Sequence, residues 1–209
     1  MQGKLQKMQR KAYLLTFFIY VVLLAFGTCS LSSEIQERPA GWAERILIDG
    51  APNLHRVTPN VYRSAQPTQE GFRNLEKLGI KTVVNLRSFH RDRLKGTSLK
   101  EIRIEMNAWH PEEEDVVQAM RVLLDEGGGP YLVHCMQGAD RTGMIIAAYR
   151  IIIQDWSRED AIDEMVNGGY DHHLIWSDIS RYLERLDIDK IRRLVGIPII
   201  LNSAGNIRY

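Results

Sequence analysis

The stretch "YLVHCMQGADRTGMIIAAYRIII", residues 131–153, constrains the fold more than any other part of the chain. Its first four residues predict a buried strand, and the apolar run that follows Thr142 predicts a buried helix. Only the segment Cys135–Arg141 connects the two, and Gly138 lets its backbone turn tightly. A strand that leads directly into a helix is typical of α/β proteins, in which strands and helices alternate along the chain.

Other parts of the chain repeat this alternation. Thr68 is the expected N-cap of a helix that ends at Gly79, and residues 81–86 follow as a buried apolar strand. Residues 100–106 alternate apolar and polar side chains, as a half-buried strand does. Further helices are expected from Pro111, from Ser157 and over residues 177–195. The sequence therefore predicts a single α/β domain with a central, largely parallel sheet flanked by helices. In such folds ligands bind at the carboxyl ends of the strands, where the Cys135–Arg141 loop begins.

The beginning of the chain predicts export or membrane anchoring. Four basic residues precede an uncharged apolar run over residues 12–27, as in a secretory signal peptide or an N-terminal anchor. We therefore expect residues 1–28 to be a signal peptide or membrane anchor, and the protein to be exported (periplasmic or extracytoplasmic) or membrane-bound. Residues 29–45 would then form a linker, residues 46–195 the folded domain and residues 196–209 a C-terminal tail.

Charge and cysteine content narrow the function classes. Of the 27 lysine and arginine residues, four precede residue 12, which leaves 23 against 26 acidic residues in the rest of the chain. A slightly acidic domain argues against a general nucleic-acid-binding protein. Cys29 lies beside the predicted N-terminal segment, so Cys135 is the one thiol of the domain and no internal disulfide is possible. We expect His172 and His173 to point apart because they are adjacent, so neither a metal site nor a cofactor is predicted.

The Cys135–Arg141 loop combines an anion site with a nucleophile. Backbone N–H groups of a loop at the start of a helix can point inward and bind an anion. The positive helix end and the Arg141 guanidinium favour the thiolate form of Cys135, which is the nucleophilic form. Arg141 offers two parallel donors to a phosphate, and Thr142 can donate a hydrogen bond to the sulfur. The loop therefore predicts attack of sulfur on the phosphorus of a tetrahedral dianion.

The sequence "HCMQGADRTG", residues 134–143, resembles the signature loop of cysteine-dependent protein tyrosine and dual-specificity phosphatases, as found in bacterial dual-specificity enzymes. The resemblance extends through "VYRSAQP" and "GIKTVVNLR", so it covers residues 53–190. It implies a phosphatase in which Cys135 forms a phosphocysteine intermediate, with His134 and Thr142 in supporting roles. It also implies that the phosphate is bound by Met136, Gln137, Gly138, Ala139, Asp140 and Arg141.

Two groups of carboxylates are candidates for the general acid that protonates the leaving oxygen. Asp140 immediately precedes Arg141, and resemblance to myotubularins and some bacterial phosphatases, which carry Asp at this position, implies an acid inside the loop. The stretch "NAWHPEEEDV" offers Glu112 and Asp115 instead, although acidic residues at the start of a helix also stabilise the helix dipole. We expect Asp140 to be the acid, with Glu112 or Asp115 as the alternative.

Basic residues elsewhere allow two interpretations. The family resemblance implies that Arg63 in "YRSAQP" helps to build the site; alternatively, Arg63 stabilises the fold. The cluster after residue 86 attracts an anionic substrate or forms a solvated loop. This cluster contains Arg87, Arg91, Arg93 and Lys95.

Three functions are compatible with these features, and they differ in partner. A protein phosphatase would act on phosphotyrosine, or also on phosphoserine and phosphothreonine, in phosphorylated proteins. A phosphoinositide or inositol phosphate phosphatase is the alternative; Asp140 favours it, whereas the neutral residues Met136, Gln137 and Ala139 argue against a highly charged ring. A phosphate-binding module without turnover is the third possibility, and the presence of Cys135 together with Arg141 argues against it.

Overall fold

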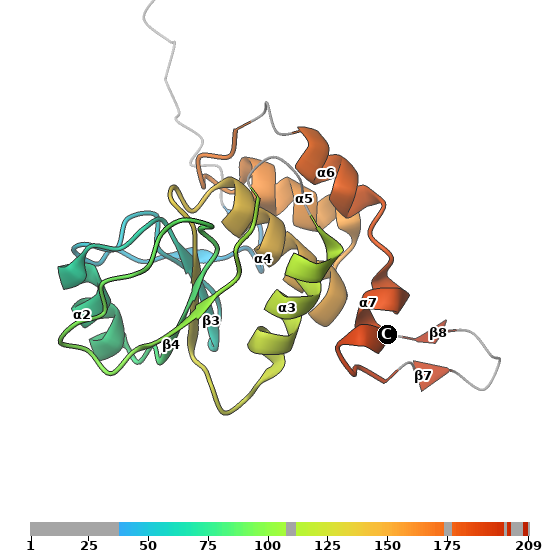
Figure 1. Cartoon of the computed structure of the whole chain (residues 1–209). Coiled ribbons are helices and arrows are strands. Elements are labelled where there is room, and N and C mark those ends of the chain that lie inside the picture. The colour runs from blue at the N-terminus through green and yellow to red at the C-terminus, as the bar shows by residue number, and fades with distance from the viewer. Residues whose placement is uncertain (1–37, 108–111, 174–176, 199, 202–206, 209) are drawn as a thin grey trace, which may run out of the picture. The chain divides into compact units, whose positions relative to one another are not determined.

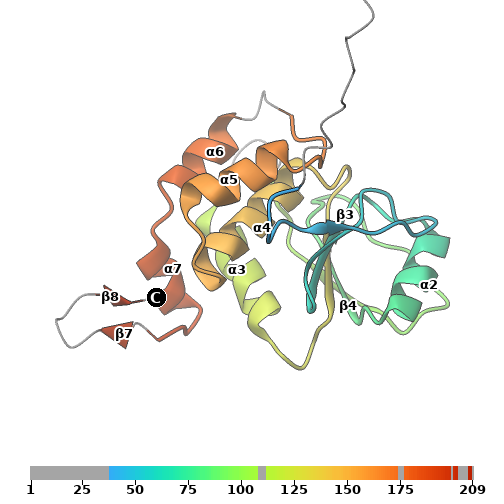
Figure 2. The same ribbon diagram turned by 180° about the vertical axis from the view of Figure 1, so that it is seen from behind.

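The computed structural model describes residues 38–107, 112–173, 177–198, 200–201 and 207–208. The chain from Arg38 onwards forms one compact unit, which Figures 1 and 2 show from opposite sides. The predicted signal peptide or anchor lies outside the described residues, so export or anchoring stays a prediction. Among the helices of the described segments, none has the length and hydrophobicity needed to cross a bilayer.

The strands of the described segments form a six-stranded sheet in the order β1-β2-β3-β6-β4-β5. From β3 to β5 all neighbours are parallel, whereas β1 and β2 add an antiparallel edge. The largely parallel sheet that the sequence predicts is therefore confirmed. The strand bounds are Glu44–Arg45 for β1, His55–Thr58 for β2, Val61–Ser64 for β3, Thr82–Asn85 for β4, Lys100–Arg103 for β5 and Tyr131–His134 for β6. Near the C-terminus, β7 (Ile200–Leu201) and β8 (Ile207–Arg208) pair antiparallel within the predicted tail.

Helices cover both faces of this sheet, as Figures 1 and 2 show. Helix α2 lies against one face, and the other helices gather on the opposite face around α4. The predicted α/β architecture with flanking helices is thus observed. The helix bounds are Gln69–Leu78 for α2, Glu113–Leu124 for α3, Asp140–Ile153 for α4, Arg158–Asn167 for α5, Ser177–Glu184 for α6 and Ile188–Leu194 for α7.

Alternating side chains of the central strands fill two separate cores. On β4, Val83 packs on the side of α2, whereas Val84 packs on the side of α4. The neighbouring strand β6 repeats the pattern with Leu132 and Val133, which stand opposite Val83 and Val84 in register. Because both faces are covered, these strands are apolar throughout, and this explains why the sequence shows continuous apolar runs there.

Several predicted boundaries are confirmed and others are shifted. The Thr68 side chain accepts a hydrogen bond from the Gly71 N–H and caps α2, and Gly79 ends that helix with φ of 105°. The single helix predicted over residues 177–195 is instead two, because Asp187 caps a new helix by accepting the Lys190 N–H at 2.9 Å.

Two predicted segment starts also differ from the structure. Strand β1 lies inside the predicted linker, where it pairs with β2, and Ala43 just before it is buried. The helix expected from Pro111 begins at Glu113, and Pro111 itself lies outside the described residues.

A buried ion pair joins the helices behind the sheet to the start of the domain. Arg150 of α4 donates to both carboxylate oxygens of Glu164 of α5, at 2.7 and 2.9 Å. Glu164 also accepts the Ala43 N–H at 2.6 Å and the Tyr170 hydroxyl at 3.1 Å. Both charged side chains are 2% exposed, so their charges are balanced by each other and by these donors rather than by water.

We expect Glu164→Gln to lower the free energy of unfolding by about 3 kcal/mol, because it leaves the Arg150 charge buried without a counter-charge. Denaturant unfolding of the variant against wild type measures the loss. Asp178→Asn is the matched control, since it removes a carboxylate from the exposed Arg181 pair and should leave the unfolding midpoint unchanged. Equal midpoints for Glu164→Gln and wild type would show that the pair does not stabilise the fold.

Candidate active site

Cys135 leaves the sheet at the carboxyl end of β6, as the sequence predicts. The residue before it, His134, stands in register with Ser64 of β3 and Asn85 of β4, so the loop starts between two parallel strands. Cys135 is a free cysteine with 3% of its surface exposed. Helix α4 then begins at Asp140, which limits the loop to a single tight curl.

Three carbonyl groups of this curl are held from outside by one segment, residues 53–66. Because the C=O and the following N–H of a trans peptide point in opposite directions, fixing these carbonyls outward turns the next N–H groups inward. The loop thereby forms the concave row of donors that an anion requires. The contacts are Gln66 N–H to the Met136 carbonyl at 3.0 Å, Asn53 Nδ2 to the Gln137 carbonyl at 3.0 Å and Arg63 Nη2 to the Gly138 carbonyl at 2.8 Å.

Gly138 occupies a position where no other residue fits. Its φ is +70°, which side chains disfavour, and a Cβ there would lie 2.5 Å from backbone atoms of Ser64 and Ala65. The loop therefore packs directly on the end of β3, and this close contact brings the curl over the sheet edge.

Arg63 lies beneath the loop as a fully buried cation. Its guanidinium carbon is 3.6 Å from the centroid of the Tyr170 ring, and its Nη2 donates to the loop carbonyl already described. Burial lowers the pKa of Arg63 to about 10, so the side chain remains charged at neutral pH. Of the two interpretations that the sequence leaves open, the structure supports both, since the same side chain packs in the core and holds the loop.

An open cleft of about 670 Å³ lies beside the loop. Arg141 reaches it and donates from Nη1 to the Leu86 carbonyl at 3.3 Å, which fixes the side chain at the edge of the sheet. Of the basic cluster after residue 86, Arg87 lines the cleft, whereas the others are exposed to solvent. The described residues lining the cleft are Arg87, Ser88, Phe89, His90, Glu105, Asn107, Met136 and Arg141.

Asp140 is held by two histidines from the segment after α5. The His173 N–H and Nδ1 make hydrogen bonds of 3.1 and 2.9 Å to its two oxygens, whereas His172 Nδ1 lies 3.1 Å from Oδ1 without hydrogen-bond geometry. The expectation that the adjacent histidines point apart is therefore wrong, because an irregular segment can turn both rings toward one carboxylate. Burial alone would raise the pKa of Asp140, but these contacts outweigh burial and hold the pKa below its usual value.

The alternative carboxylates lie on α3. Burial raises the pKa of Asp115 to about 6, and the neighbouring Glu112 and Glu114 add to the effect. Burial raises the pKa of Tyr182 on α6 to about 12, and the nearby negative charge of Asp115 contributes to this rise. Neither Glu112 nor Asp115 belongs to the described residues that line the cleft.

Thr142 differs from its predicted role. Its hydroxyl is buried, and no hydrogen-bond partner for it is found within the described residues. The expected hydrogen bond to the Cys135 sulfur is therefore not formed in this structure. Thr142 lies in the first turn of α4 and is completely buried.

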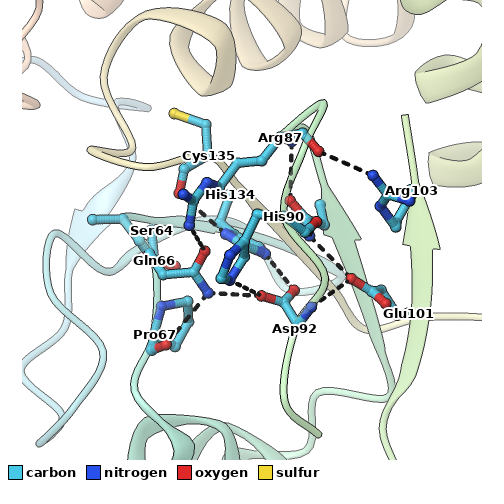
Figure 3. A network of polar contacts seen from close by, with 12 residues as sticks. Ser64, Gln66, Pro67, Arg87, His90, Asp92, Glu101, Arg103, His134 and Cys135 are labelled. Carbon is cyan, nitrogen blue, oxygen red and sulfur yellow. Dashed lines mark hydrogen bonds and ion pairs between the residues drawn. The ribbon is translucent and has the colours of Figure 1, made fainter. Parts of the chain in front are cut away.

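Sequence reasoning missed the residues that support the loop from a distance. Asn53 and Gln66 act on loop carbonyls through contacts that no local pattern reveals. Asp92 escaped attention because it lies among basic residues, yet its side chain has no exposed surface and contacts His134 at 2.8 Å (Figure 3). The useful indication was a lone acidic residue in a basic stretch that follows a buried strand.

Comparison with known proteins identifies the family of the chain. The sequence pattern of the tyrosine phosphatase family matches residues 51–193. The chain belongs to this family. It is 32% identical over 183 residues to the dual specificity protein phosphatase TpbA of Pseudomonas aeruginosa, which covers 85% of this chain and 83% of the relative. The phosphatase fold and the cysteine-dependent phosphatase class that the sequence predicts are thereby confirmed.

Solved structures of relatives superpose on the same region. TpbA of P. aeruginosa in complex with pTyr matches with a TM-score of 0.68 and 31% identity, over 77% of this chain and 99% of that chain. The catalytic core of the PP-IP phosphatase SIW14 of Saccharomyces cerevisiae, in complex with citrate, matches with a TM-score of 0.64 and 26% identity, over 72% and 94%.

We expect Gly138→Ala to weaken binding of orthovanadate, a phosphate analogue, by at least about tenfold. The new methyl group would push the loop off β3 and turn its amides away from the anion. Isothermal titration of wild type and variant measures the change. Gly196→Ala is the control, since it has a similar positive φ with open space around it and lies outside the loop. Undiminished affinity in Gly138→Ala would show that the loop tolerates displacement.

Proposed function

We propose that this chain hydrolyses phosphotyrosine in proteins, with Cys135 as the nucleophile. The observation that carries the proposal is the tight curl between Cys135 and Arg141 whose carbonyls are held from outside, which directs the following N–H groups inward. Such a curl matches the three non-bridging oxygens of a phosphate group. The exposed apolar side chains of Phe89 and Met136 at the cleft offer contact for an aromatic ring. The relative crystallised with pTyr supports this choice of substrate.

The reaction proceeds in two displacements. The thiolate of Cys135 attacks phosphorus, a sulfur–phosphorus bond forms, and the bond to the leaving oxygen breaks with its electron pair on that oxygen. The loop amides and the Arg141 guanidinium stabilise the negative charge on the equatorial oxygens in the transition state. Water then attacks phosphorus, releases inorganic phosphate and regenerates the thiolate.

The Asp140–His173 pair supplies the proton for the leaving oxygen. Asp140 is ionised in this arrangement, and an ionised carboxylate bound to Nδ1 favours the protonated imidazole. In its protonated form the His173 imidazole, which Asp140 orients through Nδ1, can donate a proton as a general acid does. Asp140 begins the first turn of α4 and is adjacent in the chain to Arg141, which lines the cleft, whereas Asp115 lies on α3; neither carboxylate is itself among the described residues that line the cleft.

Inositol phosphates are the second candidate substrates. Arg87 lines the same cleft as Arg141, so a second anionic group on the substrate would meet a second cation. Relatives named inositol diphosphatases, such as SIW14 of S. cerevisiae at 27% identity, support this candidate. The neutral loop side chains and the presence of Glu105 in the cleft favour a substrate with a single phosphate.

Cys135→Ser should lower hydrolysis of a phosphotyrosyl peptide by about three orders of magnitude or more, because serine lacks the thiolate nucleophile. Phosphate release is measured beside peptide binding, which should persist in the variant. Wild type is compared on the peptide and on a diphosphoinositol phosphate by kcat/KM. A higher kcat/KM on the inositol compound would replace the protein substrate by the second candidate, and retained turnover in Cys135→Ser would exclude the thiol mechanism.

Asp140→Asn should slow hydrolysis of a phosphotyrosyl peptide by about 100-fold or more, since the leaving tyrosine oxygen has a pKa near 10 and needs a proton. An aryl phosphate with an acidic phenol as leaving group should be much less affected. Asp115→Asn is the matched variant and should keep wild-type rates on both substrates. The reverse pattern, with Asp115→Asn selectively slow on the peptide, would assign the acid to α3.

A further inference from the structure

His134, the residue before the nucleophile, is completely buried and contacts two acceptors. Its Nε2 lies 2.8 Å from Asp92 Oδ2, and its Nδ1 lies 3.2 Å from the Cys135 carbonyl oxygen. Neither the His134 nor the Asp92 side chain has any exposed surface. Figure 3 shows Asp92 between His134, Gln66 and His90, with Cys135 directed away from this cluster.

This arrangement of acceptors defines the protonation of the ring. A carboxylate and a carbonyl oxygen can only accept, so each ring nitrogen must carry a hydrogen to make its contact. A ring protonated on both nitrogens is an imidazolium, and here it would be a buried cation next to Cys135. Burial by itself would raise the pKa of Asp92, but His134, with Gln66 and His90, outweighs burial and holds the pKa below its usual value.

Other polar groups keep Asp92 in place. Gln66 Nε2 donates to Asp92 Oδ1 at 2.7 Å, and its Oε1 accepts from Arg87 Nη1 at 2.7 Å. The Asp92 N–H donates to Glu101 Oε1 at 2.9 Å, and His90 Nε2 lies 3.8 Å from Asp92 Oδ1. A carboxylate with this many donors keeps one position, so the direction of its bond to His134 is defined.

We propose that Asp92 is a positioning residue that keeps His134 protonated on both nitrogens, and that this buried cation stabilises the thiolate of Cys135. Asp92 would thus act on the nucleophile through His134 without contacting the substrate. The inference rests on the proposed role of Cys135 as nucleophile. It explains why a buried acidic residue is placed in an otherwise basic segment.

The sign of the effect separates this proposal from simple electrostatics. If Asp92 acted on Cys135 only by its own charge, its removal would favour the thiolate, since one nearby negative charge is lost. If it acts through His134, its removal lets the imidazolium lose a proton and disfavours the thiolate. The other charged groups near Cys135, Arg63 and Arg141, are unchanged by the substitution.

The test is the pH dependence of Cys135 alkylation by iodoacetamide, which reports the thiolate without any substrate. The full chain is used with Cys29→Ser, so that Cys135 is the one reactive thiol. In this background Asp92→Asn should move the alkylation midpoint upward by about one pH unit, a tenfold loss of thiolate below the midpoint. A downward shift or an unchanged midpoint would overturn the proposal.

Glu101→Gln is the matched control. It removes one negative charge from the same cluster but does not touch His134, so its midpoint should stay or move slightly downward. An upward shift equal to that of Asp92→Asn would mean that loop packing, not His134, controls the thiolate.

If circular dichroism shows Asp92→Asn unfolded, His134→Gln takes its place, because it keeps a donor toward Asp92 and loses the ring charge. His134→Gln should move the alkylation midpoint upward by the same amount, and an unshifted midpoint in this variant would contradict the proposal.

Because alkylation needs no phosphoryl transfer, the two proposals fail in different ways. A wild-type protein with a low alkylation midpoint but no phosphatase turnover would contradict the proposed function alone. Phosphatase turnover lost in Cys135→Ser, together with an unshifted midpoint in Asp92→Asn, would contradict the role of Asp92 alone.

Discussion

The candidate active site depends on how the carbonyl groups of one loop are held. Asn53, Arg63 and Gln66 take the carbonyls of three successive loop residues and so orient the intervening peptides. An amide that donates to a phosphate needs a peptide plane that is fixed before binding. In a mobile loop, the conformational entropy lost on binding would weaken the affinity for the phosphate. The sheet supplies this order, since β3 and β6 are hydrogen-bonded neighbours that bring residues 53–66 beside the loop.

Buried charges form a second layer beneath the site. Arg63 packs on Tyr170, which in turn donates to Glu164, and Glu164 pairs with Arg150. Buried charges destabilise a fold unless each has a polar or charged partner, because burial removes their hydration. A connected series of such groups supplies these partners. On the other side of the loop, Asp92 and His134 form a buried polar contact at 2.8 Å. The site therefore stands between two buried polar clusters, which restrict its geometry more than apolar packing would.

The sequence predicted the chemistry of the loop because that chemistry is local. A thiol, a tight turn at Gly138 and a guanidinium lie within seven residues between a strand and a helix, and their spacing along the chain sets their spacing in the molecule. The helix boundaries at Thr68 and Gly79 were predicted for the same reason, since a cap depends on a few adjacent residues. The family to which the chain belongs was predicted from the same short stretch together with its flanking motifs.

Contacts between distant segments were decided only by the tertiary structure. Asp92 lies 42 residues before His134, and His173 lies 33 residues after Asp140, so no local period links them. The same holds for Thr142, whose hydroxyl was expected to donate to the sulfur but is buried without a hydrogen-bond partner among the described residues. The sequence by itself determined which groups are candidates for the reaction, because they are neighbours in the chain. The fold alone decided the orientation of those groups, because orientation depends on the side chains and backbone groups from distant segments that are packed against them.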